Sequence, residues 1–170
     1  MKKVEFTIQG TSSMLMHRYP MEDDQGKEAK RKGEQYDPTE DAEKCLYKNK
    51  QGCFIPSTWI EACMREAGKG FKKGKATYKA IIQSSAFVSP DEISLGLKTY
   101  DAIDRRPAVI QRNRIVRSRP MFNPGWQITF EIEYDDQEIK EEVLLQILTE
   151  AGRTKGIGDY RPKFGRFKVV

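Results

Sequence analysis

The feature of this sequence that most constrains its fold is a change of hydrophobic period between residues 126 and 151. From Trp126 to Tyr134 every second residue is apolar or aromatic, which predicts a strand with one buried face. Over 138–151 the apolar residues recur at helical spacing, which predicts an amphipathic helix that ends at Gly152. The chain is therefore expected to combine strands with helices.

Weaker signals predict the remaining elements. Alternating or apolar runs predict strands over 3–9, 80–88, 93–97 and 164–170, and an arginine-bearing strand or hairpin arm over 109–117. Asp37-Pro38 predicts the start of a helix that extends to about Tyr47. A second helix is predicted over 57–67, where Thr58 and Glu61 have the spacing of a capping box.

The order of the main elements predicts a known arrangement. Strands over 3–9, 80–88, 126–134 and 164–169, with helices over 57–67 and 138–151, follow one another as β-α-β-β-α-β. This order is typical of an α+β domain of ferredoxin-like, or RRM-like, fold. We expect one such domain over 1–170, with a polar insertion over 20–50 and an arginine-rich insertion over 98–122.

Charge is distributed in blocks along the chain. The overall net charge is only +5, but residues 65–79, 105–119 and 153–168 carry +5, +6 and +5, whereas 135–150 carry −5. Basic blocks of this kind favour a polyanion as partner, and nucleic acid above all.

Other classes of protein are disfavoured. No run of 18 or more apolar residues is present, and the N-terminal residues lack the apolar core of a signal peptide, so we expect a cytoplasmic protein without a membrane partner. The cysteines, Cys45, Cys53 and Cys63, have neither metal-knuckle nor disulfide-framework spacing and are interpreted as structural thiols. No cofactor and no metal site are expected. Met14, Met16 and Met21 are interpreted as packing or interface residues.

The loop before the last strand is the first candidate site. Glycines there permit the backbone to approach another chain closely, four basic residues can pair with phosphates, and two aromatic residues can stack on bases. These candidate binding residues are Lys155, Gly156, Gly158, Tyr160, Arg161, Lys163, Phe164 and Arg166. The alternative is an ordinary glycine-assisted turn with solvated charges.

The arginine run over 105–119 is the second candidate site. It contains six arginines and no acid, and a guanidinium group pairs well with phosphate. Arg112 and Arg114 share one face of a strand and Arg117 lies on the other, and all three are candidate phosphate contacts. The alternative is that these arginines pair with the acidic insertion or the acidic helix.

Three residues are candidates for catalysis, with a hydrogen-bonding or solvated role as the alternative. His17, the one histidine of the chain, follows the first strand and could act as a general base toward a ribose 2′-OH. Asp23 and Asp24 lie in the polar insertion and could act as an acid or as metal ligands.

Three segments occur together in an order that resembles the RAMP superfamily, the RRM-like proteins that form the backbones and processing nucleases of CRISPR effector complexes. They are the first strand with Gly10 and the following Leu15-Met16-His17, the helix opening Cys53-Phe54-Ile55-Pro56-Ser57-Thr58-Trp59-Ile60 with Arg65 downstream, and Gly156-Ile157-Gly158 through Gly165-Arg166-Phe167. With the strand order, the resemblance spans nearly the whole chain. The C-terminal end also resembles uncharacterised prophage-encoded proteins, which suggests a mobile-element member.

The resemblance implies binding of single-stranded RNA, with the guide on a basic face held by the glycine loop. It also implies side-by-side assembly of copies or of other effector subunits, with the two insertions contacting neighbouring nucleotides. Target-cleaving members use an aspartate after the first strand, for which Asp23 or Asp24 is the nearest match, and processing members use a histidine near His17.

The leading hypothesis is therefore a non-catalytic, homo-oligomeric subunit that binds single-stranded nucleic acid, RNA in preference to DNA. One alternative is an RNA endonuclease of the same superfamily. Another is a phage or mobile-element protein that binds single-stranded DNA or mimics a CRISPR subunit.

Overall fold

The structure is a computed structural model that describes residues 1–19, 37–110 and 113–170, with no account of the side chains of 108–115. Its main sheet contains four strands, all paired antiparallel in the order β11-β1-β10-β6. These are β1 (Lys2–Gly10), β6 (Ala86–Ser89), β10 (Gln127–Tyr134) and β11 (Phe167–Val169). The strands predicted over 3–9 and 126–134 are confirmed, and the closing strand is shorter than predicted.

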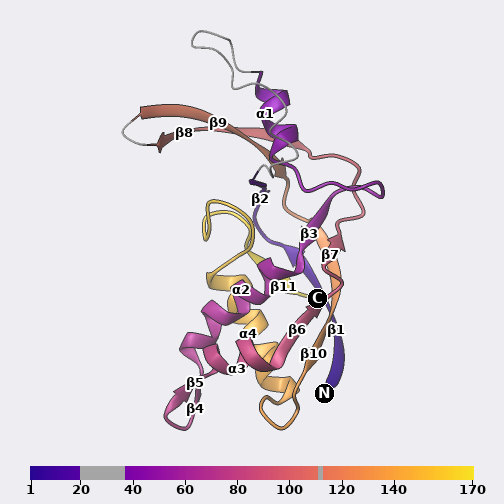
Figure 1. The fold of residues 1–170 in the computed structure, drawn as a ribbon, viewed down its shortest axis with the longest axis vertical. Helices are drawn as coiled ribbons and strands as arrows, with labels where there is room; N and C mark the ends of the chain where they lie inside the picture. The colour runs from indigo at the N-terminus through magenta and orange to yellow at the C-terminus, as the bar shows by residue number, and fades with distance from the viewer. Residues whose placement is uncertain (20–36, 111–112) are drawn as a thin grey trace.

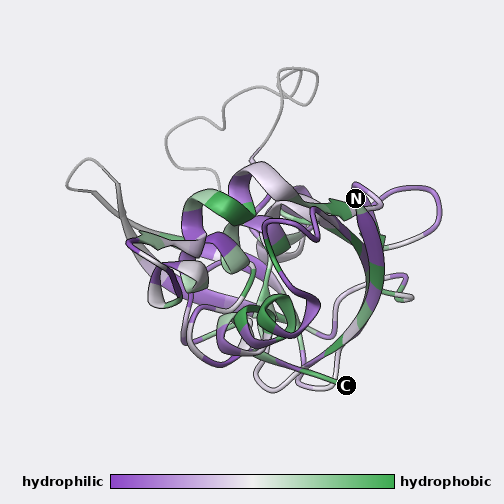
Figure 2. Cartoon of the chain, turned by 90° about the horizontal axis from the view of Figure 1, so that it is seen from below, coloured by the Kyte–Doolittle hydropathy of each residue, from purple (hydrophilic) through white to green (hydrophobic). Residues whose placement is uncertain are grey.

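Three helices lie together on one side of this curved sheet (Figures 1 and 2). They are α2 (Ser57–Ala67), α3 (Tyr78–Ser85) and α4 (Glu141–Thr154). Alternate residues of β1 and β10, including Ile8, Ile128 and Phe130, are buried in one core with Ile60 of α2 and Leu148 of α4. The molecule is thus a mixed α+β fold whose core lies between the sheet and these helices.

The opposite face of the sheet is polar. Alternation along the strands places Glu5, Glu131 and Glu133 on this face. Lys3 Nζ donates to Glu131 Oε1 at 2.8 Å across the two central strands. The sheet therefore buries one face and leaves a carboxylate-bearing face open.

The strand predicted over 80–88 is wrong for its first six residues, which belong to α3. A short apolar run does not by itself distinguish a helix from a strand. Here Ile82 is buried, and its Cδ1 would lie 3.0 Å from a Cβ added to Gly68 at the end of α2. Packing between α2 and α3 therefore sets the helical state, and the strand begins only at Ala86.

The helix predicted over 57–67 is confirmed, but its predicted capping box is wrong, and so are the predicted ends of the helix over 138–151. No side chain caps α2, because the helix already begins at Ser57, and Glu61 Oε1 instead accepts a hydrogen bond from Val88 N at 3.0 Å. Helix α4 begins at Glu141 and continues past Gly152, whose absent Cβ would collide with the backbone of Phe167. Gly152 thus permits close helix–strand packing rather than ending the helix.

The remaining elements are short, except for one long hairpin that extends from the body (Figure 1). The hairpin is formed by β8 (Ala102–Ile110) and β9 (Asn113–Phe122), and β2 (Met14–Leu15) pairs with β9. The others are α1 (Pro38–Lys44), capped as predicted by Asp37, with β3 (Phe54–Pro56), β4 (Lys72–Lys73), β5 (Ala76–Thr77) and β7 (Glu92–Ser94). Strand β7, which overlaps the predicted strand over 93–97 only at Ile93 and Ser94, pairs with β3 outside the main sheet.

The packing roles predicted for cysteine and methionine are confirmed where the structure describes them. Met14 and Met16 are fully buried, Cys53 and Cys63 are buried, and Met21 lies outside the described residues. The three cysteines are free thiols. In the part of the chain that the structure describes, no helix has the length and apolar character needed to cross a membrane.

Candidate nucleic-acid interface

The loop that joins α4 to β11 is held against β2 and against the segment that joins β1 to β2. Asp159 N donates to Leu15 O at 2.9 Å, and Gly165 N donates to Ser13 O at 2.8 Å. Closer to β11, Thr11 N donates to Arg166 O at 2.8 Å. These backbone bonds connect the two ends of the chain and fix the course of the loop.

Two glycines of this loop are needed for that close contact. Gly156 has φ +70° and Gly158 has φ +82°, a region that disfavours residues with a Cβ. A Cβ on Gly158 would lie 2.5 Å from Leu15 O. The sequence predicted close approach to another chain, whereas the backbone that approaches Gly158 belongs to this chain itself.

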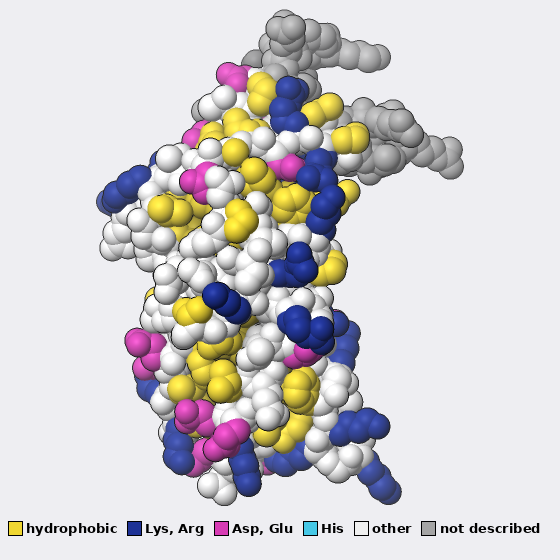
Figure 3. Space-filling view, turned by 180° about the vertical axis from the view of Figure 1, so that it is seen from behind, with side chains coloured by type: hydrophobic (Ala, Val, Ile, Leu, Met, Phe, Trp, Pro, Cys, Tyr) yellow, Lys and Arg dark blue, Asp and Glu magenta, His cyan; other side chains and the backbone are white. Residues whose placement is uncertain are grey.

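The outer side of the loop carries exposed cations. Lys155, Arg161, Lys163 and Arg166 are all exposed. Figure 3 shows Lys and Arg side chains along the right-hand margin of that view, from the upper part of the molecule to its lower end. Four of the predicted phosphate contacts are therefore accessible on one loop.

The two aromatic residues of the loop have different environments. Tyr160 is 49% exposed, whereas Phe164 is only 8% exposed. The Arg106 guanidinium lies 5.2 Å from the centre of the Tyr160 ring and 4.8 Å from that of Phe164, and it also pairs with Asp104. Tyr160 can therefore stack on a base, while Phe164 serves to hold the loop against β8.

The arginines of the hairpin do not form one uniform surface. Arg106 and Arg119 are engaged within the molecule, whereas Arg117 is partly exposed. Arg114 lies within β9, but its side chain is not described, and Arg112 lies outside the described residues. Of the three predicted hairpin contacts, the structure thus places the side chain of Arg117 alone.

An ion-pair cluster joins the hairpin, the loop and the segment after β2. Arg119 Nε lies 2.5 Å from Asp159 Oδ2, and His17 Nδ1 lies 3.5 Å from the same oxygen. The Arg119 side chain is only 9% exposed, and its Nη1 is buried without a hydrogen-bond partner among the described residues. The hydrogen bond from His17 and the positive charge of Arg119 lower the pKa of Asp159 to about 2, against the effect of burial.

This cluster contains the residues that sequence reasoning missed. Asp159 is the one acid in the basic block over 153–168, and Arg119 was one of six arginines in its block. An isolated acid within a basic block was the available signal. Nothing in the local pattern indicated that Asp159 would meet an arginine 40 positions earlier in the chain.

A small cleft of about 140 Å³ lies beside this cluster. Its lining includes His17 and Arg18 after β2, Lys44 and Cys45 at the end of α1, and Arg117 of β9. Burial raises the pKa of the Cys45 thiol, although Arg117 and Arg119 act in the opposite direction. With Asp41 as the acid of its lining, the cleft carries more cationic than anionic side chains, and its thiol is not activated.

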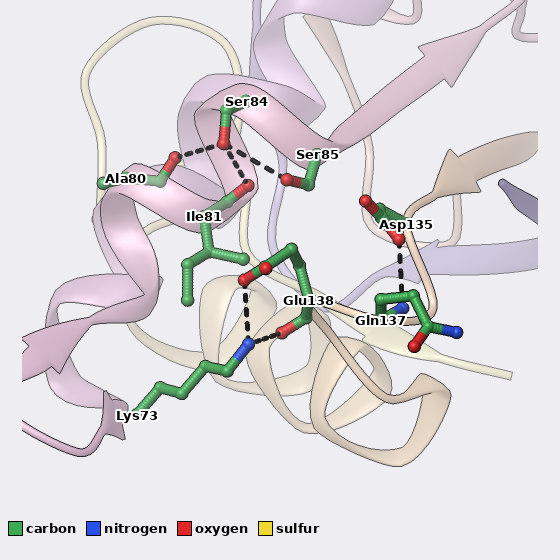
Figure 4. Close-up of polar contacts among 8 residues, drawn as sticks. All are labelled: Lys73, Ala80, Ile81, Ser84, Ser85, Asp135, Gln137 and Glu138. Carbon is green, nitrogen blue, oxygen red and sulfur yellow. Dashed lines mark hydrogen bonds and ion pairs between the residues drawn. The ribbon is translucent and has the colours of Figure 1, made fainter.

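The third basic block lies apart, at the lower end of the molecule (Figure 1). Lys73 of β4 donates to the Glu138 backbone oxygen at 2.7 Å and to its Oε2 at 2.8 Å, as Figure 4 shows. Lys72 and Lys75 are exposed on the same small hairpin. Lys73 of this block therefore contacts the acidic turn between β10 and α4.

The acidic catalytic candidates receive no structural account, because Asp23 and Asp24 lie outside the described residues. Among residues 1–19, 37–110 and 113–170, no group of three His, Cys, Asp or Glu side chains is placed to hold a metal ion. No family model matches this chain, and comparison with the curated proteins gives no match.

Proposed function

We propose that this chain is a single-stranded nucleic-acid-binding subunit that assembles side by side along a strand, in a complex like the CRISPR effectors. Its ligand is RNA of the guide type in preference to DNA. The subunit binds the strand and is not catalytic. Other copies of the chain, or other effector subunits, are its protein partners.

One observation carries this proposal, namely the convergence of the glycine loop with the arginine-bearing hairpin. Arg106 and Arg119 attach the hairpin to the loop through Tyr160, Phe164 and Asp159. The cations of the loop itself are exposed, and they lie around Tyr160, whose side chain is half-exposed. A basic groove with an aromatic side chain is the arrangement that binds single strands without base pairing.

The sheet topology supports the finer, ferredoxin-like assignment that accompanies this proposal. Strands β1 and β6 run parallel with β10 between them, and β10 and β11 run parallel with β1 between them. Helices α2 and α4 each connect the two strands of one such pair. Two split β-α-β units of this kind make up the β-α-β-β-α-β arrangement of the RRM-like proteins.

The open sheet face is not the surface proposed for the strand. An RRM stacks bases on aromatic residues of its sheet. Here the open face carries Glu5, Glu131 and Glu133 on its two central strands, and carboxylates repel phosphates. Its exposed aromatic residue, Phe87, lies on the edge strand opposite Glu133. We therefore place the strand on the loop and hairpin.

The choice of RNA over DNA, and the side-by-side assembly, rest on the resemblance of Gly156–Phe167 and the two earlier motifs to the RAMP superfamily. The cations themselves contact phosphates, which both nucleic acids carry. RNA selectivity is therefore the part of the proposal most in need of an experiment.

The deciding experiment examines what the protein carries when it is purified without nuclease treatment. We expect a raised ratio of absorbance at 260 nm to 280 nm, removal of the bound material by ribonuclease and not by deoxyribonuclease, and sequencing reads from single-stranded RNA. Material sensitive to deoxyribonuclease alone would favour the mobile-element alternative. A protein that neither carries nor binds either nucleic acid would contradict the proposal.

A second candidate function is favoured by the His17 geometry. Nδ1 of His17 lies beside Asp159, so a neutral imidazole that directs its Nδ1 proton at this carboxylate has its lone pair on Nε2. Such an imidazole can accept the proton of a ribose 2′-OH, whose oxygen then attacks the adjacent phosphate; the P–O5′ bond breaks, and the released 5′-oxygen takes a proton from the imidazolium or from water. The candidate activity is thus RNA cleavage without a metal ion.

Cleavage is tested by incubating labelled RNA with the protein in EDTA. Products ending in a 2′,3′-cyclic phosphate, lost in His17→Ala, would establish the endonuclease. Intact RNA with the wild-type protein would remove this candidate and leave the binding function unchanged.

A further inference from the structure

An open hollow lies between the glycine loop and the C-terminal ends of two helices. Its volume is about 560 Å³, within the roughly 300–1,000 Å³ typical of small-ligand sites. Its lining includes Glu66 of α2, Thr154 and Lys155 at the end of α4, and Asp159, Tyr160 and Arg161 of the loop. The hollow is on the side of the loop that carries the accessible tyrosine.

Tyr160 provides a stacking surface in this hollow. The Arg106 guanidinium lies over its ring, and Phe164 meets it edge-on with 6.2 Å between ring centres. Tyr160 nevertheless remains 49% exposed. The ring is held from one side and offers its remaining surface to a ligand, which suits a flat nucleobase.

The charges that line the hollow fit a nucleotide that is bound in one orientation. Lys155 and Arg161 attract a phosphate, whereas the carboxylates Glu66 and Asp159 repel it. A nucleotide suits both the cations and the carboxylates when its phosphate lies beside the cations and a base edge with N–H donors faces a carboxylate. The mixture of charges therefore selects an anion that also carries N–H donors.

Each carboxylate is partly occupied, which limits what it can accept. Lys69 Nζ lies 2.5 Å from Glu66 Oε2, and no described residue donates a hydrogen bond to Glu66 Oε1. Asp159 Oδ2 faces Arg119 and His17. Glu66 Oε1 is thus suited to a single donor, such as the exocyclic amino group of cytosine. Uracil places a carbonyl oxygen at the equivalent position, which a carboxylate repels.

We propose that this hollow binds one nucleotide whose base carries an exocyclic amino group, cytosine above uracil, with the base on Tyr160 and the amino group donating to Glu66. The inference rests on the proposed function and adds a base preference to it. The phosphate of the same nucleotide lies at Arg161 and Lys155.

The test compares two pyrimidine oligonucleotides, because cytosine and uracil differ at the amino group and are similar in size. Fluorescence anisotropy is measured with 5′-labelled eight-residue oligocytidylate and oligouridylate. We expect the wild-type protein to bind oligocytidylate about fivefold more tightly, the effect of one hydrogen bond. In Glu66→Gln the ratio should fall to about one, since the amide carries a donor as well as an acceptor.

A matched control separates the pocket from general charge effects. Glu150 of α4 pairs with Arg153 three residues away, much as Glu66 pairs with Lys69, and it is not among the residues that line the hollow. Glu150→Gln should retain the fivefold ratio. Tyr160→Leu should weaken binding of both oligonucleotides.

The outcomes distinguish this inference from the function on which it rests. Equal binding of the two oligonucleotides by the wild-type protein would overturn the base preference and leave the binding function standing. A preference that survives in Glu66→Gln would overturn the assignment to Glu66. Failure of the wild-type protein to bind either oligonucleotide would overturn both. Circular dichroism of each variant confirms that it is folded.

Discussion

Two basic regions of this molecule have the same net charge in sequence and very different structural surroundings. Residues 65–79 and 153–168 each carry +5. In the first, Lys73 pairs with Glu138, and the other lysines of the small β4–β5 hairpin are exposed. In the second, the cations surround a loop that three other segments hold in place through backbone bonds and the Arg119–Asp159 pair.

The comparison shows that a binding site depends on convergence and support, beyond charge alone. Exposed lysines on a two-stranded hairpin attract a polyanion without defining where its phosphates lie. A loop with a fixed backbone presents its cations in a defined arrangement around an aromatic ring. Variants made in pairs, one in each region, test this distinction.

The largest effect on stability is expected from Arg119→Ala. The substitution leaves Asp159 without its cation, and removal of one partner from a buried pair costs several kcal/mol. Because the Asp159 side chain is 33% exposed, we expect a loss of about 2 kcal/mol in unfolding free energy. Urea denaturation measures it. Lys75→Ala, in the other basic region, should change the stability by less than about 0.5 kcal/mol, and equal losses in the two variants would contradict the comparison.

A pair of glycine substitutions tests the support of the loop. Gly158 and Gly74 both have positive φ, +82° and +64°, but a Cβ on Gly74 meets no atom within 4 Å. Gly74→Ala should cost about 1 kcal/mol for the backbone conformation alone. Gly158→Ala should cost about 1 kcal/mol more, because the Cβ also displaces the loop from Leu15. Thermal denaturation measures the loss of stability in each variant. A loss in Gly158→Ala no larger than that in Gly74→Ala would contradict the comparison.

Binding of RNA should separate the two regions at the level of affinity. We expect Arg161→Ala with Arg166→Ala to weaken binding of a single-stranded RNA about tenfold and to reduce the salt slope by about 1.4, or 0.7 per lost phosphate contact. Lys72→Ala with Lys75→Ala removes the same charge from the β4–β5 hairpin and should alter the affinity less than about twofold. Anisotropy titrations at several salt concentrations measure both. Equal losses would mean that charge alone determines binding.

Acid should weaken the attachment of the loop to the rest of the molecule. The pKa of Asp159 is lowered from 3.8 to about 2 in the folded protein, so its pair contributes fully above about pH 4 and is lost as pH falls toward 2. The wild-type protein should therefore lose more stability over this window than Asp159→Asn. Identical acid profiles of the two proteins would show that Asp159 is not held ionised by Arg119 and His17.

The smallest effect is expected from Lys73→Ala. Lys73 and Glu138 form an ion pair whose side chains are 41% and 50% exposed. Such pairs contribute about 0.5 kcal/mol or less to the unfolding free energy. Urea denaturation at low and high salt should show a difference that disappears with salt, and a loss near that of Arg119→Ala would invalidate the contrast between the two regions.

Much of the fold followed from local patterns. The periods of β1, β10 and α4 predicted the elements that form the core, because alternate burial along a strand and a stripe along a helix leave a direct trace in the sequence. The strand predicted over 80–88 was wrong for its first six residues because an apolar run suits either a helix or a strand. Helix α3 forms there, where it packs against α2. The predicted capping box of α2 and the predicted end of α4 at Gly152 were wrong because Glu61 and Gly152 serve contacts with distant strands.

The candidate site divides in the same way. The sequence by itself determined that the loop over 155–166 is basic, glycine-rich and aromatic, since these are properties of its own residues. The tertiary structure decided that Tyr160 is exposed while Phe164 is buried, and that Arg119 pairs with Asp159 rather than with a phosphate. Such pairings depend on which distant segments the sheet and its hairpin bring together, and residues 40 positions apart carry no local record of their contact.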